Sequence, residues 1–245
     1  MHEAEWLLAG LFAVVAALYS SVGHGGASGY LAMMALVGVA PGVMKPTALV
    51  LNLVVSATAC MRFARSGHFS WRLLWPFILG SIPFAFVGGA LAVPDRLYHA
   101  LVGVALVAAA ARLAINPAAA DAKAATTPPV PAAVGIGAGL GLLSGVTGVG
   151  GGIYLSPVLL FMRWATTKQT AGIAAAFIFF NSAAGLLGNL ASVRTIPSAL
   201  PIWIAAVFIG GFVGSGLGAD RFSPLVFRRV LAAVLLLAAW KLVLT

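Results

Sequence analysis

The sequence predicts an all-α integral membrane protein with two inverted repeats. Each repeat is a glycine-broken helical hairpin followed by three transmembrane helices, which makes about 8 to 10 membrane helices in all. Three observations predict this class. Hydrophobic residues make up 62% of the 245 residues and charged residues only 8%, whereas soluble domains carry about 25% charged residues. Long stretches contain no charged residue, and one glycine-rich pattern occurs twice.

The uncharged stretches are long enough to cross a bilayer, which takes about 20 apolar residues per helix. They cover residues 6–44, 73–94, 124–162, 169–193 and 195–219. Backbone polar groups must be paired internally in lipid, so only helices or closed barrels cross it. Barrel strands alternate apolar and polar residues, and runs such as LVGVALVAAAA at 101–111 do not. The spans are therefore predicted to be helices.

The charge pattern and the sequence motifs exclude several other classes of function. The net charge is +9, but the 14 Lys and Arg residues are scattered between apolar spans, unlike the basic face of a nucleic-acid-binding protein. We find no GxxxxGK[ST] loop, no CxxC or HExxH pair and no Ser/His/Asp set that could meet. We therefore expect no nucleic-acid partner, no enzymatic activity, no cofactor and no metal site. The single Cys60 cannot form an internal disulfide.

The chain divides near its middle. An Ala-, Pro- and Thr-rich segment at 116–131 predicts a linker between a first repeat at 1–115 and a second at 132–245, within one membrane domain. The repeats align at an offset of 125 residues. The matching positions are GHGGA (23–27) with GVGGG (148–152), Pro76 with Pro201, Gly89 with Gly214, and Asp95-Arg96 with Asp220-Arg221. A pattern that recurs at a fixed offset is typical of internal structural repeats.

The apolar segments follow the same order in both repeats. A first segment ends at the glycine cluster, a short segment follows it, and three more complete the repeat. The predicted segments are 6–22, 28–42, 46–61, 73–93 and 97–113, then 132–147, 152–162, 169–190, 197–218 and 224–243. Because the second segment of each repeat is short for a full crossing, we favour re-entrant hairpins, with two full spans as the alternative.

Charge bias predicts how the repeats are oriented. The first two segments of each repeat are joined at the glycine cluster. If these two segments together cross the membrane an even number of times, ten Lys and Arg residues lie on one side of the membrane and four on the other. An odd count gives seven on each side. The excess of basic residues on the cytoplasmic side of membrane proteins favours the even count, which inverts the second repeat relative to the first. Inverted repeats are typical of secondary transporters.

The two glycine clusters are the main candidates for a substrate site. Glycine permits backbone conformations that other residues avoid, and unwound backbone at membrane depth occurs only where it is buried or lines a cavity. A helix that restarts there directs free N–H groups and a partial positive charge at the break, which suits an anion. The alternative is that the glycines only allow close helix packing.

Polar residues inside the spans complete the candidate set. All five acidic residues map to termini, loops or the linker, and transporter sites for cations or protons usually use intramembrane carboxylates, so we expect an anion. The candidate substrate-binding residues are Gly23, His24, Gly25, Gly26, Ser28, Thr47, Asn52, Ser56, Gly148, Gly150, Gly151, Gly152 and Asn181. His24 is either a packed neutral histidine or a titrating gate residue. Lys45 is interpreted as a residue that extends its charged end to the membrane interface.

The chain resembles the TauE/SafE, or sulfite exporter, family of membrane proteins. The residues that carry the resemblance are GHGGASGYLAMMALVGVAPGVMKPTALVL with Thr47, the basic loop RFARSGHFSWR, GVGGGIYLSPVLLF with Pro157, and TTKQTAGIAAAFIFFNS with Asn181. The chain departs from the family pattern at His24, Ala48 and Gly172-Ile173. The resemblance implies export of sulfite, a sulfonate or a related organosulfur or organic acid.

The predicted function is therefore export of a small anion through a midplane site between the two glycine breaks, in the inner (plasma) membrane. The expected partners are the anionic solute and the lipid bilayer, and a homo-oligomer is left open. Two alternatives stay open at this point. One is an importer of a small organic solute, and the other is a non-transporting membrane scaffold protein.

Overall fold

The computed structural model describes residues 2–114, 126–190, 197–220, 236 and 240, and every regular element in this part of the chain is a helix. This confirms the all-α class. The helices are α1 (His2–Ser20), α2 (Ala27–Leu36), α3 (Pro41–Arg65), α4 (Trp71–Ala90), α5 (Asp95–Ala114), α6 (Val130–Thr147), α7 (Gly152–Phe161), α8 (Thr167–Asn189) and α9 (Leu200–Asp220). The predicted last segment, at 224–243, lies outside the described residues apart from Leu236 and Trp240.

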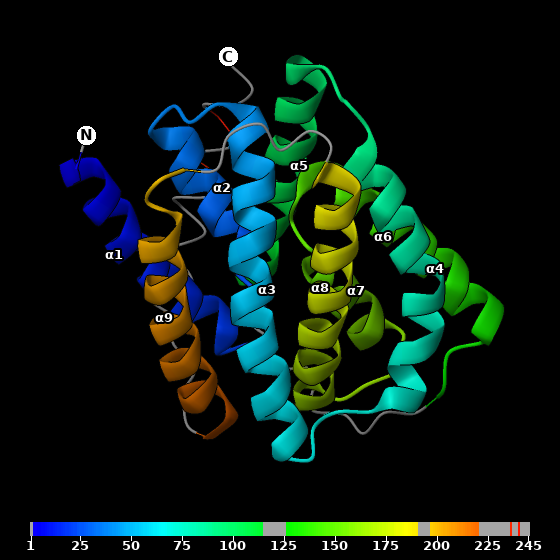
Figure 1. The fold of residues 1–245 in the computed structure, drawn as a ribbon. Helices are drawn as coiled ribbons and strands as arrows, with labels where there is room; N and C mark the ends of the chain where they lie inside the picture. The colour runs from blue at the N-terminus through cyan, green and yellow to red at the C-terminus, as the bar shows by residue number, and fades with distance from the viewer. Residues whose placement is uncertain (1, 115–125, 191–196, 221–235, 237–239, 241–245) are drawn as a thin grey trace.

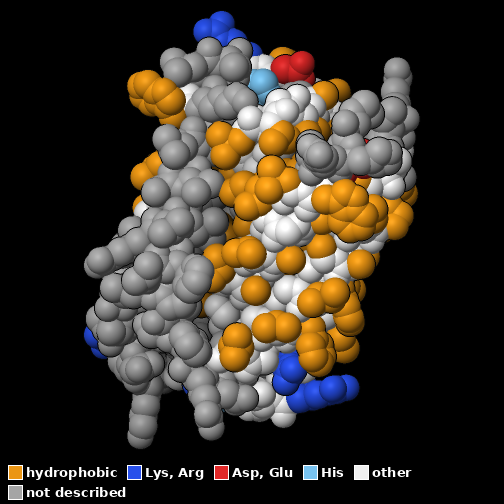
Figure 2. Space-filling view, turned by 90° about the vertical axis from the view of Figure 1, so that its left-hand side faces the viewer, with side chains coloured by type: hydrophobic (Ala, Val, Ile, Leu, Met, Phe, Trp, Pro, Cys, Tyr) orange, Lys and Arg blue, Asp and Glu red, His pale blue; other side chains and the backbone are white. Residues whose placement is uncertain are grey.

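Five of these helices are long and apolar enough to cross a membrane. They are α3 from Gly42, α4, α6, α8 and α9 up to Leu217. By contrast, α2 and α7 have ten residues each, about half the length that a full crossing needs. Figure 2 shows apolar side chains over the middle of one face, with Lys and Arg side chains at its two ends. The pattern fits a bundle whose middle lies in lipid.

The helices pack through small residues that bring backbones into direct contact. On α6, a Cβ atom at Gly137, Gly141 or Gly145 would overlap a backbone carbonyl of α4, and the register of these contacts makes the two helices parallel. A Cβ atom at Gly210 or Gly214 of α9 would likewise overlap a backbone carbonyl of α1, and the register of these contacts makes α9 and α1 parallel. Lipid gives helices no hydrophobic reason to associate, so such close backbone packing is a main source of stability in membranes.

Corresponding helices of the two predicted repeats run in opposite directions. In Figure 1, α3 runs from the upper to the lower end of the molecule, and α8 beside it runs upward. The contacts agree, because Gly172, near the start of α8, meets Phe63 near the end of α3, whereas Gly185 meets Leu49 near its start. Likewise α4 runs upward and α9 downward.

Some predicted boundaries were wrong. The third segment was predicted at 46–61, but α3 extends from Pro41 to Arg65. The second segment was predicted to end at residue 42, but α2 ends at Leu36, because Gly38 has a φ of 77° and Val39 N–H donates to the Met34 carbonyl at 2.9 Å. This is a left-handed glycine stop of the Schellman type. The linker was predicted to reach residue 131, but α6 begins at Val130. Pro131 is tolerated there because the first-turn N–H groups of a helix have no helical partner.

Candidate functional site

The two glycine clusters form the breaks between α1 and α2 and between α6 and α7. In the first break, Gly23 and Gly26 have φ values of 76° and 97°. The second break contains three left-handed glycines, Gly148, Gly150 and Gly151, with φ values of 77°, 85° and 77°. Residues with a Cβ atom rarely adopt this conformation. Each break therefore needs glycine, and each is followed by a short helix whose N-terminus lies at the break.

Asn52 of α3 connects the two breaks. Its Oδ1 accepts a hydrogen bond from Ala27 N–H at 3.1 Å, at the start of α2. Its Nδ2 lies 3.2 Å from the Val149 carbonyl in the second break and 3.3 Å from Ser182 Oγ on α8. The Asn52 side chain is fully buried. One amide group therefore joins both breaks and the two central helices, which are far apart in the sequence.

The glycines beside Asn52 are required by space as well as by conformation. A Cβ atom on Gly25 would overlap Asn52 Oδ1, and a Cβ atom on Gly150 would overlap Asn52 Nδ2. Gly150 also faces Ile178 of α8, where the added Cβ would lie 2.9 Å from Cγ2. The two breaks thus meet the same amide group from two directions.

His24 forms a second connection between the breaks. Its Nε2 lies 3.2 Å from Ser156 Oγ on α7, and its Nδ1 lies 3.0 Å from the Val22 carbonyl. Because a carbonyl oxygen only accepts, Nδ1 carries a proton. Ser156 Oγ also donates to the Gly152 carbonyl at 2.9 Å. The imidazole is 7% exposed, so His24 is part of the packed centre.

The other glycines of the set pack closely at the breaks. A Cβ atom on Gly23 would overlap the backbone of Ala171 on α8, and on Gly26 it would lie 2.7 Å from Tyr30 Oη. At Gly151 the added Cβ would lie 2.8 Å from Phe177 Cε1, and at Gly152 it would lie 2.5 Å from Ile178 side-chain carbons. The breaks are therefore held against α8 and α2.

The remaining polar residues of the predicted set are less closely connected to the breaks. Ser28 Oγ and Tyr19 Oη lie 2.8 Å apart, which links α2 to α1. Ser56 donates to the Leu53 carbonyl of its own helix at 3.4 Å, and Thr47 is buried on α3. Asn181 Nδ2 donates to the Phe177 carbonyl at 2.7 Å, but its Oδ1 is buried without a protein partner. The structure thus connects Asn52 to both breaks, while Ser56 and Asn181 bond within their own helices.

Lys45 differs from its interpretation as an interfacial residue. It is 8% exposed, and its Nζ donates to the Gly88 and Gly89 carbonyls at 3.2 and 2.9 Å. These carbonyls lie in the last turn of α4, where no helical N–H remains to pair with them. At the second break, a Cβ atom on Gly148 would lie 3.3 Å from Lys45 Cγ. A buried positive charge therefore lies next to the second glycine cluster.

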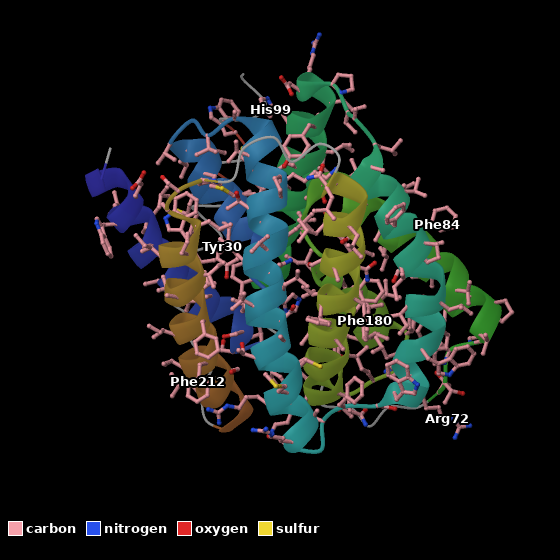
Figure 3. All side chains as sticks on the ribbon, viewed as in Figure 1. Tyr30, Arg72, Phe84, His99, Phe180 and Phe212 are labelled. Carbon is pink, nitrogen blue, oxygen red and sulfur yellow. The ribbon has the colours of Figure 1, made fainter. Side chains whose placement is uncertain are left out.

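Sequence reasoning also missed Ser156 and Tyr30. The Tyr30 hydroxyl donates to the Gly25 carbonyl at 2.9 Å. Tyr30 lies inside the bundle, whereas Arg72 and His99 lie at its opposite ends (Figure 3). Ser156 follows the second cluster by four residues, and this spacing was the only available signal. Among the described residues, no group of three or more His, Cys, Asp or Glu side chains could hold a metal ion.

A bundle with five helices long and apolar enough to span a membrane, and with two glycine breaks joined through one buried side chain, is typical of membrane transport proteins. The model of the family described as Sulfite exporter TauE/SafE matches residues 7–242. The chain belongs to this family. It is also 42% identical over 238 residues to the "Probable membrane transporter protein y4hK" of Sinorhizobium fredii (strain NBRC 101917 / NGR234), with 96% of each chain covered. Both the family and this relative are membrane transporters rather than enzymes. No solved structure matches the chain.

Proposed function

We propose that this membrane transporter exports a small anion across the inner (plasma) membrane, with sulfite, a sulfonate or a related organic acid as the solute class. The proposed path passes between the two glycine breaks. The observation that carries the proposal is the bridge formed by Asn52, which binds Ala27 N–H at the start of α2 and the Val149 carbonyl in the second break. Two helix N-termini therefore lie near one buried polar group, and both favour negative charge.

The charges around the breaks support an anionic solute. The Lys45 side chain is buried next to the second break. The acidic residues within the described ranges lie at helix ends instead: Glu3 and Glu5 at the start of α1, Asp95 at the start of α5 and Asp220 at the end of α9. An ionisable residue inside a membrane bundle usually faces a partner or a substrate path. A buried ammonium group whose bonds go to carbonyl oxygens alone favours a negative solute.

We further propose that the repeats are inverted, with the N-terminus outside and the loop between α3 and α4 inside. The opposite directions of α3 and α8, and of α4 and α9, support this. In the second repeat, Thr126 Oγ1 lies 3.4 Å from the Met162 carbonyl. The start of α6 and the end of α7 therefore lie on the same side of the molecule. This supports an even number of crossings for α6 and α7 together.

Cysteine labelling tests this topology. In a Cys60→Ser background, we expect Ser66→Cys and Met162→Cys to react with an impermeant maleimide only from the cytoplasmic side, and Val37→Cys only from outside. All three positions are exposed at helix ends. Ser66 and Met162 belong to different repeats. Inverted repeats place both residues on the same side of the membrane, whereas repeats of the same orientation place them on opposite sides. Labelling of these two from opposite faces would contradict it.

The transport proposal is tested by flux in proteoliposomes. Purified protein should give saturable uptake of radiolabelled sulfite and methanesulfonate above protein-free liposomes. Dimethyl sulfone, a neutral analogue of methanesulfonate with a similar shape, should neither be carried nor compete. Equal competition by the neutral analogue would mean that the site does not select charge, and it would favour an importer of uncharged solutes.

A further inference from the structure

The described helices form two large hydrophobic cores, and each core combines helices of both predicted repeats. The first core contains buried side chains of α1, α2, α3, α5 and α9. The second contains buried side chains of α4, α6, α7 and α8. The helices α4 and α9 are therefore exchanged between the repeats. We call the helices of the first core the first body and those of the second core the second body.

The exchanged helices are packed backbone to backbone inside their bodies. In the first body, a Cβ atom on Gly214 of α9 would overlap the Ala17 carbonyl of α1. In the second body, a Cβ atom on Gly188 of α8 would overlap the Phe86 carbonyl of α4, and the glycines of α6 meet the α4 backbone as described above. Closely packed interiors resist deformation. Each body is therefore expected to move as one unit.

The two bodies meet along α3 and α8, with the glycine breaks at their boundary. A separate small cluster joins these two helices near the end of α3 and the start of α8, and it consists of Ala59, Phe63, Ala171 and Ala175. At the centre the boundary is polar. Asn52 of the first body binds the Val149 carbonyl and Ser182 Oγ, and His24 lies 3.2 Å from Ser156 Oγ of the second body. The proposed solute path thus lies where the bodies meet.

Each glycine break also packs against the start of the third helix of the other repeat. A Cβ atom on Gly148 would lie 3.3 Å from Lys45 Cγ on α3, and one on Gly23 would overlap the backbone of Ala171 on α8. Lys45 and Ala171 both lie in the second turn of their helices. Because α3 and α8 run in opposite directions (Figure 1), these two contacts lie toward opposite ends of the molecule. We call the contact at Lys45 the outer contact and the one at Ala171 the inner contact.

The two contacts differ in their chemistry. At the outer contact, the Lys45 ammonium group of the first body bonds to the Gly88 and Gly89 carbonyls of the second body at 3.2 and 2.9 Å. An anion bound beside the second break would compete with these neutral carbonyls, because hydrogen bonds between two charged groups are the stronger ones. The inner contact is backbone packing, for which an anion does not compete. Binding of an anion therefore weakens the outer contact selectively.

We propose that the two bodies rotate against each other along α3 and α8, and that a bound anion opens the outer contact by drawing Lys45 away from α4. The inference rests on the transport function proposed above. Opening the outer contact exposes the breaks to the proposed outer side, and opening the inner contact exposes them to the cytoplasm, which is alternating access by rigid-body movement. A ligand shifts such an equilibrium only through a contact that differs between the two states. Lys45 supplies that contact, and it favours release to the outside.

Distances between pairs of spin labels test which helices move together. In a Cys60→Ser background, the label sites are Val37 and Ser66 in the first body and Leu91 and Met162 in the second, all exposed at helix ends. The measurement is double electron–electron resonance on purified protein in lipid nanodiscs. Saturating methanesulfonate should lengthen the Val37–Leu91 distance at the outer end by more than about 2 Å, the scale of domain rearrangements on binding. The Ser66–Met162 distance at the inner end should not lengthen.

The same four sites supply matched controls. The pairs Val37–Ser66 and Leu91–Met162 each lie within one body, so methanesulfonate should leave both distances unchanged, and dimethyl sulfone should change none of the four. Lys45→Gln keeps a donor for the α4 carbonyls but not the charge, so the outer contact should stay closed and the response to methanesulfonate should be lost.

Three results would overturn the proposal. They are a Val37–Leu91 distance that saturating methanesulfonate leaves unchanged, a distance within one body that changes by as much as the distance between bodies, and a wild-type response in Lys45→Gln. The proposed function is judged separately by anion flux in proteoliposomes. Flux that persists after any of these results would leave the proposed function intact and reject only this movement.

Discussion

Gly25→Leu and Gly150→Leu are each expected to reduce anion flux to the background of protein-free liposomes. A side chain at either position would overlap the amide group of Asn52, and Gly150 also has a φ of 85°, which residues with a Cβ rarely adopt. Either variant must displace Asn52 and separate the two breaks. The measurement is uptake of labelled sulfite by reconstituted protein, normalised to the amount of protein inserted.

The chain offers matched controls for this prediction. Gly10 on α1 and Gly135 on α6 are exposed, and a Cβ atom at either meets nothing within 4 Å. Gly10→Leu and Gly135→Leu are therefore expected to insert and transport like the wild type. If Gly25→Leu and Gly150→Leu also keep wild-type flux, the glycine clusters act only in helix packing, and the substrate path lies elsewhere.

Lys45→Gln is expected to reduce the apparent affinity for anions about tenfold or more, because a contact to a charged partner is worth about 1.5–3 kcal/mol. Glutamine can still donate from its amide to the α4 carbonyls that Lys45 binds, so the loss of charge is the main change. Lys45→Arg keeps the charge and should retain more of the affinity. The measurement is the concentration dependence of methanesulfonate uptake for the three proteins.

A purely structural role for Lys45 predicts a different outcome. If its only function is to pair with the last carbonyls of α4, Lys45→Gln and Lys45→Arg should change Tm and leave the anion affinity as it is. Arg72→Gln serves as the control for a loss of positive charge, because Arg72 is exposed at the far end of α4. An affinity for anions that is the same in Lys45→Gln as in the wild type would contradict the assignment.

The helices could be predicted from the sequence because lipid leaves few choices. Long uncharged runs must pair their backbone groups internally, and the glycine clusters give clear interruptions between α1 and α2 and between α6 and α7. The ends of α2 and α6 were harder. Gly38 ends α2 by adopting a φ of 77°, and Pro131 is accommodated in the first turn of α6. Both depend on local backbone geometry that hydropathy does not report.

The candidate site was only partly predictable, for a different reason. The glycines and Asn52 are visible as unusual residues in apolar segments, but their partners come from distant parts of the chain. The bond of Asn52 to Val149 spans 97 residues, and that of His24 to Ser156 spans 132. Lys45 near a helix start fits an interfacial residue equally well, and only the fold places it against α4.

Charge-selective flux through the glycine breaks tests the central claim most directly. The measurement is counterflow of radiolabelled methanesulfonate in proteoliposomes with the same buffer on both sides, for the wild type, Gly150→Leu and the control Gly135→Leu. The account predicts saturable counterflow in the wild type and in Gly135→Leu, inhibition by sulfite but not by dimethyl sulfone, and none in Gly150→Leu. Counterflow of equal rate in Gly150→Leu, or equal inhibition by dimethyl sulfone, would contradict it.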